Sequence, residues 1–174
     1  LNTASFSDVK LGIILGFTGP IESLTPDIAA GAELAIDEIN KSKHFSMGKV
    51  SGVRADSTCV DSAAATTAAE RLITSDKVNG IMGADCSGVT TAILQQVAMA
   101  NGMVMVSPSA TSPALSTVED NGLFFRTAPS DARQGQVVAD ILKEKGLTNI
   151  AISYVNNDYG KGLAASIEEN HKAA

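Results

Sequence analysis

Short apolar runs alternate with amphipathic segments along most of this 174-residue sequence. The apolar runs are typical of buried parallel strands, which we expect at 9–16, 50–56, 78–83, 103–107, 123–127 and 149–155. The segments between them have helical periodicity, and we expect helices at 26–39, 62–75, 89–101, 131–146 and from 161 onward. This order predicts an α/β fold built on a doubly wound parallel sheet.

Capping residues and apolar spacing predict where the helices begin and which faces they bury. Thr25-Pro26-Asp27 offers an N-cap, a proline at the first helical position and an acid in the first turn, and Asp61 caps the second helix. The predicted buried faces are Ile28, Ala32, Ala35, Ile36 and Ile39; Leu72 and Ile73; Val89, Ile93, Val97 and Ala100; and Val137, Val138, Ile141 and Leu142.

Two predicted strands in the middle of the sequence end in small, hydroxyl-rich turns at 86–88 and 107–111. Ligands of open parallel sheets bind beyond the carboxyl ends of the strands, where these turns lie. Backbone N–H groups at a helix start, with hydroxyls beside them, suit a small carboxylate. Ser87, Ser109 and Thr111 are therefore candidate anion-binding residues, although capping a helix or shaping a turn is as common a role for each alone.

Other polar residues have weaker claims to a ligand. Tyr159 follows the last predicted strand, where its ring could cover a ligand or simply pack at the surface. Three acids could pair with a ligand ammonium, but a solvated loop or helix-cap role is commoner: Asp85, Asp131 and Asp158. For Arg126, structural pairing with a carboxylate is favoured over binding an acid, and we expect His44 and His171 at the surface.

Composition and motifs exclude several function classes. The net charge of −6 and pI of about 4.8 argue against nucleic acid or an anionic membrane as partner. No apolar run approaches the roughly 20 residues of a membrane helix, and residues 1–8 do not resemble a signal peptide, which fits a cytosolic or a processed, exported protein. There is no dinucleotide or phosphate-loop motif and no nucleophile–base constellation, so we expect no cofactor and no enzyme.

The two cysteines, Cys59 and Cys86, each follow a predicted strand at the same end of the sheet. Without a supporting histidine pair they do not form a credible zinc site, so we expect no metal. From the residues alone, two buried thiols and a disulfide that would indicate an oxidising compartment are equally good interpretations.

Seven short motifs occur in an order that resembles one family. They are 10–20 (KLGIILGFTGP), 31–40 (GAELAIDEIN), Cys59, 83–88 (GADCSG), 106–113 (VSPSATSP), 125–127 (FRT) and 157–162 (NDYGKG). Together they resemble the periplasmic branched-chain amino-acid (leucine/isoleucine/valine) binding proteins, which are solute receptors of ABC transporters. The resemblance covers nearly the whole chain.

This resemblance implies a type I periplasmic-binding-protein fold, a two-lobed venus flytrap that closes on a small amino acid and delivers it to a membrane permease. It implies that the ligand carboxylate meets Ser87 and Thr111, in a turn that includes Ala110. The ligand amino group would meet the carbonyl of Ser109 and the Thr111 hydroxyl, and Tyr159 would face the cleft from the second lobe. It also implies a disulfide between Cys59 and Cys86, and an exported, periplasmic protein whose signal peptide is already removed.

The restart of the pattern after Thr127 predicts two domains. Residues 1–127 would form an N-terminal ligand-binding lobe that lacks its C-terminal return segment, and 128–174 would begin a truncated second lobe. We expect an incomplete chain, because one strand flanked by two helices cannot bury its faces.

The ligand side chain is left open by the sequence. Many relatives place an aromatic residue over the ligand in the loop after the first strand, where this chain has Leu24 and Thr25. An aromatic acid, a small amide, a ligand-sensing or regulatory module and a dimerising half-domain remain as alternatives.

Overall fold

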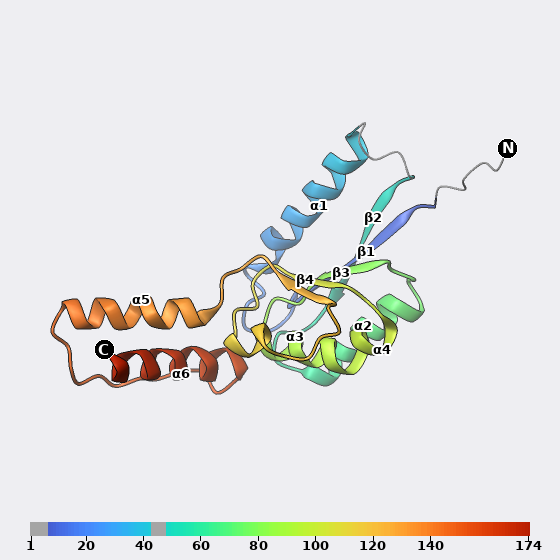
Figure 1. The fold of residues 1–174 in the computed structure, drawn as a ribbon. Helices are drawn as coiled ribbons and strands as arrows, with labels where there is room; N and C mark the ends of the chain where they lie inside the picture. Colours follow the sequence, from blue (N-terminus) through green and yellow to red (C-terminus); the bar gives the residue numbers. More distant parts are fainter. Residues whose placement is uncertain (1–6, 43–47) are drawn as a thin grey trace.

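The core of the molecule is a five-stranded parallel sheet with the order β2-β1-β3-β4-β5 (Figure 1). A computed structural model describes residues 7–42 and 48–174, so His44 lies outside the described residues. The strands are β1 (Val9–Leu15), β2 (Val50–Asp56), β3 (Gly80–Gly83), β4 (Met105–Ser107) and β5 (Phe124–Arg126). The chain steps outward from β1 to β2 and then crosses to β3, β4 and β5, which confirms the predicted doubly wound sheet.

Helices α1 (Thr25–Lys41), α2 (Ser62–Thr74), α3 (Ser87–Ile93) and α4 (Met99–Asn101) flank this sheet. Two more helices, α5 (Asp131–Glu144) and α6 (Asp158–Ala173), follow β5. A π-helical stretch, η1 (Leu94–Ala98), joins α3 to α4, and a 3₁₀ turn, η2 (Pro113–Ser116), follows β4. Among the described residues, no helix is both long enough and apolar enough to cross a membrane.

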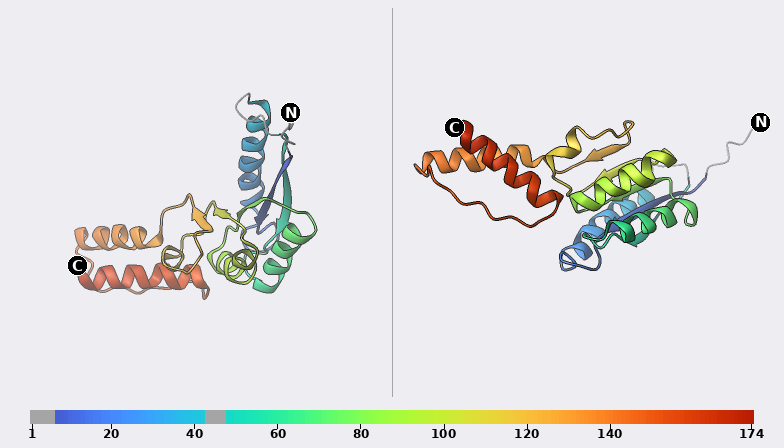
Figure 2. Two further views of the ribbon diagram at one scale, coloured as in Figure 1. Left: turned by 45° about the vertical axis from the view of Figure 1, so that its right-hand side comes forward. Right: turned by 90° about the horizontal axis from the view of Figure 1, so that it is seen from below.

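The pair of helices α5 and α6 projects beyond the edge of the sheet and runs side by side in the same direction (Figures 1 and 2). Residues 145–157 return between the end of one helix and the start of the other. The two helices meet through Gly135, where a Cβ would overlap Ser166. This unit is therefore distinct from the sheet layer that precedes it.

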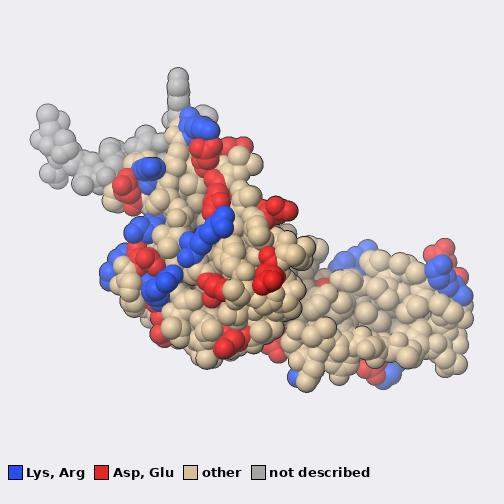
Figure 3. Space-filling view, turned by 180° about the vertical axis from the view of Figure 1, so that it is seen from behind, with Lys and Arg blue, Asp and Glu red and all other residues tan. Residues whose placement is uncertain are grey.

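Charged side chains are not spread evenly over the molecule. On the face shown in Figure 3, acidic and basic residues intermix over the sheet part, whereas the middle of the α5–α6 part carries few charges. Val137 and Ile141 of α5 are 39% and 45% exposed, which adds apolar surface to this projecting unit.

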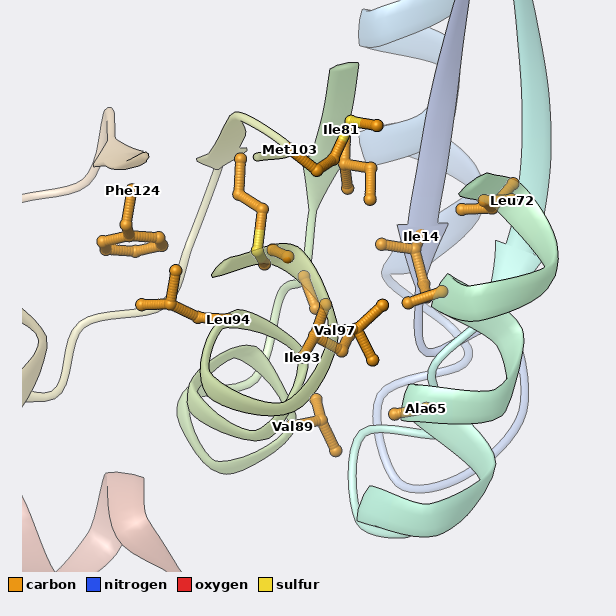
Figure 4. Close-up of a cluster of buried hydrophobic side chains, with 14 of the residues drawn as sticks. Ile14, Ala65, Leu72, Ile81, Val89, Ile93, Leu94, Val97, Met103 and Phe124 are labelled. Atoms are coloured by element: carbon orange, nitrogen blue, oxygen red, sulfur yellow. The ribbon is translucent and has the colours of Figure 1, made fainter. Parts of the chain in front are cut away.

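Alternation along β1 sends neighbouring side chains into two different cores. Ile14 joins a large cluster with Leu72 of α2 and with Ile93 and Val97 of the α3–η1 segment (Figure 4). Ile13 points to the opposite face, in a smaller cluster that includes Ala29 of α1. The period of two in a strand thus assigns α1 to one face and α2 with α3 to the other.

Several predicted helix details are wrong for identifiable physical reasons. Thr25 is not the N-cap of α1 but its first residue, and its hydroxyl donates to the carbonyls of Gly16 and Glu22. Ala35 and Ile39 are exposed, because the face toward the sheet is centred on Ala29. Ala100 is exposed while Leu94 and Ala98 are buried, because the wider turn of η1 shifts the later residues around the helix axis.

The predicted structure after residue 145 also needs correction. Residues 149–155 form no strand, because no other strand of the described chain lies beside them to complete a ladder. Of the face predicted for α5, Val137 and Ile141 are exposed, whereas the small residues Gly135 and Ala139 are buried, facing α6. α6 begins at Asp158, three residues earlier than predicted, where the Asn157 side chain accepts the N–H of Gly160 at 2.8 Å.

Candidate functional site at the carboxyl edge of the sheet

The loops that follow the first four strands converge at the carboxyl edge of the sheet. One oxygen of Asp85, after β3, accepts the N–H of Gly16, after β1, at 2.7 Å. The other oxygen accepts the hydroxyl of Ser57, after β2, at 3.2 Å. Asp85 is buried, which corrects the expectation of a solvated loop acid.

A disulfide joins two of these loops. Cys59 and Cys86 are bonded with their Cα atoms 5.2 Å apart, which confirms the pairing implied by the family resemblance. The bond ties the loop after β2 to the residue that immediately precedes α3. It fixes the start of the helix that carries Ser87.

Ser87 is the first residue of α3 and only 1% exposed. Its Oγ accepts the N–H of Ser112 at 3.1 Å, so the turn after β3 and the turn after β4 meet at this hydroxyl. Among the described residues no acceptor takes the Ser87 hydroxyl proton, which leaves it free to donate. The structure thus brings the two hydroxyl-rich turns into contact.

The turn after β4 presents three candidate residues in a fixed arrangement. The Ser109 hydroxyl donates to the carbonyl of Asp85 at 3.1 Å, and the Ala110 N–H donates to Ser107 Oγ at 3.0 Å. The Thr111 hydroxyl donates to a carboxylate oxygen of Asp131 at 2.8 Å. Because the protons of Ser109 and Thr111 are used inside the protein, their oxygens remain available as acceptors.

Arg126, at the end of β5, holds this turn from behind. Its guanidinium donates to the carbonyls of Ala110 at 3.1 Å and Ser112 at 2.8 Å. The guanidinium also donates to Ser116 Oγ at 2.5 Å. The predicted pairing with a carboxylate is wrong, because these neutral acceptors take its protons and Arg126 is in none of the ion pairs of the described residues. Burial lowers the pKa of Arg126, and the charge of Asp131 opposes that shift.

Asp131 is 2% exposed and lies directly behind Thr111. It is neither a solvated acid nor the N-cap of α5, since Ser130 caps the helix by accepting the N–H of Ala132. Burial raises the pKa of Asp131, while the Thr111 hydrogen bond and the charge of Arg126 act in the opposite direction. The site therefore has a buried acid that takes the proton of the Thr111 hydroxyl and leaves its oxygen available as an acceptor.

The first turn of α6 approaches the same region. A Cβ at Gly162 would lie 3.0 Å from Pro113 Cδ, and one at Gly88 would lie 3.6 Å from a carboxylate oxygen of Asp158. Tyr159 is the next residue along α6 and is 43% exposed. α6 thus brings Asp158 beside the start of α3, and Tyr159 is adjacent to it in the helix.

Some polar residues lie outside this arrangement or give no metal site. His171 is half-buried, with Nε2 3.3 Å from the Thr148 carbonyl oxygen, so it is less exposed than expected. A polar depression between α5 and α6 is lined by none of the candidate ligand-binding residues. No cluster of three potential metal ligands occurs within residues 7–42 and 48–174.

Comparison with known proteins identifies the family to which this chain belongs. Residues 28–174 match the model of the receptor family ligand binding region. The chain belongs to this family. Curated relatives include Leu/Ile/Val-binding protein homolog 3 of Brucella melitensis, 32% identical over 93% of this chain and 43% of that protein. The Leu/Ile/Val-binding protein of Citrobacter freundii is 31% identical over 99% of this chain and 46% of that protein.

Solved structures agree with the fold. The substrate-binding protein LivJ of Streptococcus pneumoniae, in complex with isoleucine, has a TM-score of 0.83 at 28% identity, over 95% of this chain and 47% of that one. A solute-binding protein of R. palustris in complex with 4-hydroxybenzoate has the same TM-score, 0.83, at 20% identity, over 96% of this chain and 44% of that one. The chain spans about half the length of the relatives it matches. The type I periplasmic-binding-protein fold and the resemblance to branched-chain amino-acid-binding proteins are confirmed.

Proposed function

We propose that this chain carries the ligand-binding edge of an extracytoplasmic solute receptor of an ABC transporter, which binds a small, branched-chain or similar hydrophobic amino acid. Its role is binding and delivery to a membrane permease, not catalysis. Curated relatives named Leu/Ile/Val-binding proteins and solved structures with leucine or isoleucine support this proposal. The Cys59–Cys86 disulfide supports a periplasmic location, because such bonds persist in oxidising compartments.

The observation that carries the proposal is the polarity of the hydrogen bonds at the carboxyl edge. Ser87 accepts from the protein and keeps its proton, so it can donate to a ligand carboxylate. Ser109 and Thr111 donate to the protein and keep their lone pairs, so they can accept from a ligand ammonium. A donor and two acceptors on adjoining turns suit a zwitterion.

The same polarity favours an amino acid over an aromatic acid. An aromatic acid has no ammonium, so it would leave the acceptor oxygens of Ser109 and Thr111 without a donor from the ligand. A site built to hydrogen-bond a polar group rejects ligands that lack it, because its own polar atoms are then unpaired. The R. palustris protein in complex with 4-hydroxybenzoate is only 20% identical in sequence, so its similarity supports the fold and not the ligand class.

We assign residues 1–127 and 128–174 to two lobes that face each other across the ligand. The end of the sheet at β5 and the projection of α5 and α6 beyond it support this division. Ser87 and the turn of Ser109, Ala110 and Thr111 belong to the first lobe. Tyr159 belongs to the second, on the helix whose first turn approaches the start of α3.

Calorimetric titration of the full-length gene product with L-leucine tests the proposal. Ser87→Ala and Thr111→Val should each weaken binding by about tenfold, since a hydrogen bond to a charged group contributes roughly 1.5–3 kcal/mol. Thr74→Val is the matched control, because its hydroxyl only caps the carbonyl of Glu70 within α2. Equal affinities for all four proteins would place the ligand elsewhere, and binding of benzoate in preference to leucine would replace the ligand class.

A further inference from the structure

We propose that Asp85 is a positioning residue that holds the loops after four neighbouring strands together and so sets the geometry of Ser87 and Ser109. The inference rests on the proposed function for its effect on binding. Its structural part concerns the protein without ligand, and it can be tested separately.

The Asp85 carboxylate connects three loops through three donors. One oxygen accepts the N–H of Gly16 at 2.7 Å, and the other accepts the N–H of Cys86 at 2.9 Å and the hydroxyl of Ser57 at 3.2 Å. These donors come from the loops after β1, β3 and β2 respectively. A carboxylate has enough lone pairs to accept all three at once, which a neutral side chain of the same size does not.

The backbone of Asp85 reaches the fourth loop. Its carbonyl accepts the hydroxyl of Ser109, after β4, at 3.1 Å. Ser87 lies two residues further along the chain, and its Oγ accepts the N–H of Ser112 from the same fourth loop. Ser109 is therefore hydrogen-bonded to Asp85 directly, and Ser87 is held two residues from it along the chain.

The environment of Asp85 indicates that its charge is balanced by these donors alone. Its exposed fraction is 3%, and it takes part in none of the ion pairs of the described chain. A buried carboxylate is costly unless hydrogen bonds replace its water. Loss of the Ser57 hydroxyl leaves the carboxylate short of one donor, whereas loss of a carboxylate oxygen leaves a loop donor without its acceptor.

The disulfide does not duplicate this function. It joins the loops after β2 and β3, whereas Asp85 also bonds to Gly16 after β1 and Ser109 after β4. The approach at Gly16 is close: a Cβ there would lie 3.1 Å from Cys59 Cβ and 3.4 Å from an Asp85 oxygen. Thr18 separately bonds the first loop to Asp56 at the end of β2, with a hydroxyl–carboxylate distance of 2.6 Å. Asp85 adds the connection from the first loop to the loops after β3 and β4.

The test compares Asp85→Asn and Ser57→Ala in the full-length gene product. Asp85→Asn removes the charge and turns one acceptor into a donor, while Ser57→Ala keeps the charge and removes one donor. Leu72→Ala is the control, because it lowers stability from a fully buried position on α2 away from these loops. L-leucine affinity is measured by calorimetry well below the melting temperature of every variant, and backbone amide NMR spectra are recorded without ligand.

We expect leucine affinity to fall about tenfold in Asp85→Asn and about threefold in Ser57→Ala, and less than twofold in Leu72→Ala despite its lower melting temperature. The ligand-free spectra should show displaced amide resonances in all four loops for Asp85→Asn, including Gly16 and Ser109. Unchanged affinity in Asp85→Asn would overturn the positioning role. A higher affinity in Asp85→Asn together with an unchanged affinity in Ser57→Ala would also overturn it, because removing repulsion between Asp85 and the ligand carboxylate would explain that result.

If the wild-type protein binds no amino acid, the proposed function fails, and the spectra still decide the structural part. Amide changes spread over the four loops would support Asp85 as their common anchor. Changes confined to the residues beside position 85 would overturn it.

Discussion

Removing the Cys59–Cys86 disulfide should lower stability without displacing the loops that it joins. The bond closes a segment with a sequence separation of 27. For that length the chain-entropy relation gives a change of about −12 cal/mol/K in the unfolded state, or about 3.6 kcal/mol at 25 °C. In a domain of this size, that loss corresponds to a melting temperature lower by roughly 7–14 °C.

The native loops should stay in place because hydrogen bonds connect the same segments. Ser57 and Cys86, two of the residues that bond to the Asp85 carboxylate, lie on the two sides of the disulfide. The effect of removal is therefore assigned to the unfolded state, where the constraint on the chain is lost. Leucine affinity in the Cys59→Ala/Cys86→Ala variant should remain within about threefold of the wild type.

Urea denaturation followed by circular dichroism, in oxidised and reduced buffer, measures this effect. The oxidised wild type should exceed both the reduced wild type and the double variant in unfolding free energy by similar amounts. Reductant added to the double variant is the control and should change nothing. A decrease in unfolding free energy below about 1 kcal/mol on removal of the disulfide would refute its predicted contribution to stability. A loss of leucine binding as large as that of Asp85→Asn would refute the prediction that hydrogen bonds keep the loops in place without the disulfide.

Three further predictions concern single positions. Gly135→Ala should lower the unfolding free energy by about 1–3 kcal/mol, since its Cβ would lie 2.7 Å from the Ser166 carbonyl carbon. Gly31→Ala, with nothing within 4 Å of its Cβ, should raise the unfolding free energy by up to about 1 kcal/mol. Thermal melts of the two variants test the difference. Asp131→Asn should keep or raise the melting temperature at pH 7, because burial raises the pKa of Asp131 and makes its charged form costly. The same substitution should weaken leucine binding about tenfold. A lower melting temperature with unchanged leucine binding would contradict this prediction. Burial raises the pKa of Asp56, but hydrogen bonds from Thr18 and Thr58 outweigh this effect and lower the pKa. The unfolding free energy of the wild type should therefore exceed that of Asp56→Asn by about 1–2 kcal/mol at pH 7, and this difference should disappear as the pH falls below about 3.9. A constant difference from pH 7 to pH 2 would contradict the prediction.

The sheet and the candidate turns could be predicted from the sequence because their signals are local. The apolar run of β2 was predicted with its observed bounds, 50–56, and Asp61 caps α2 as expected, accepting the N–H of Ala64 at 3.0 Å. Small hydroxyl-bearing residues after buried strands likewise marked the turns at Ser87 and Thr111. These features depend on a few neighbouring residues, and no distant partner decides them.

The parts that failed depend on partners far along the chain. Residues 149–155 have the composition of a strand but no neighbouring strand in the described chain, so no ladder forms. The buried face of α5 follows its contact with α6 at Gly135, which apolar spacing alone does not reveal. Asp85 and Asp131 were expected to be solvated loop acids or helix caps, because a loop acid gives no sign of the donors that will fold around it. For Asp85, its place just after an apolar strand is the available signal.

Calorimetric titration of the full-length gene product with L-leucine, L-leucinamide and 4-methylpentanoate tests whether the carboxyl edge of the sheet binds a zwitterion. The three ligands share one side chain and differ only in the carboxylate and the ammonium. We expect measurable binding of leucine and at least about tenfold weaker binding of both analogues, because Ser87 donates to the carboxylate, and Ser109 and Thr111 accept from the ammonium. Equal binding of 4-methylpentanoate and leucine would contradict the zwitterion site at the carboxyl edge.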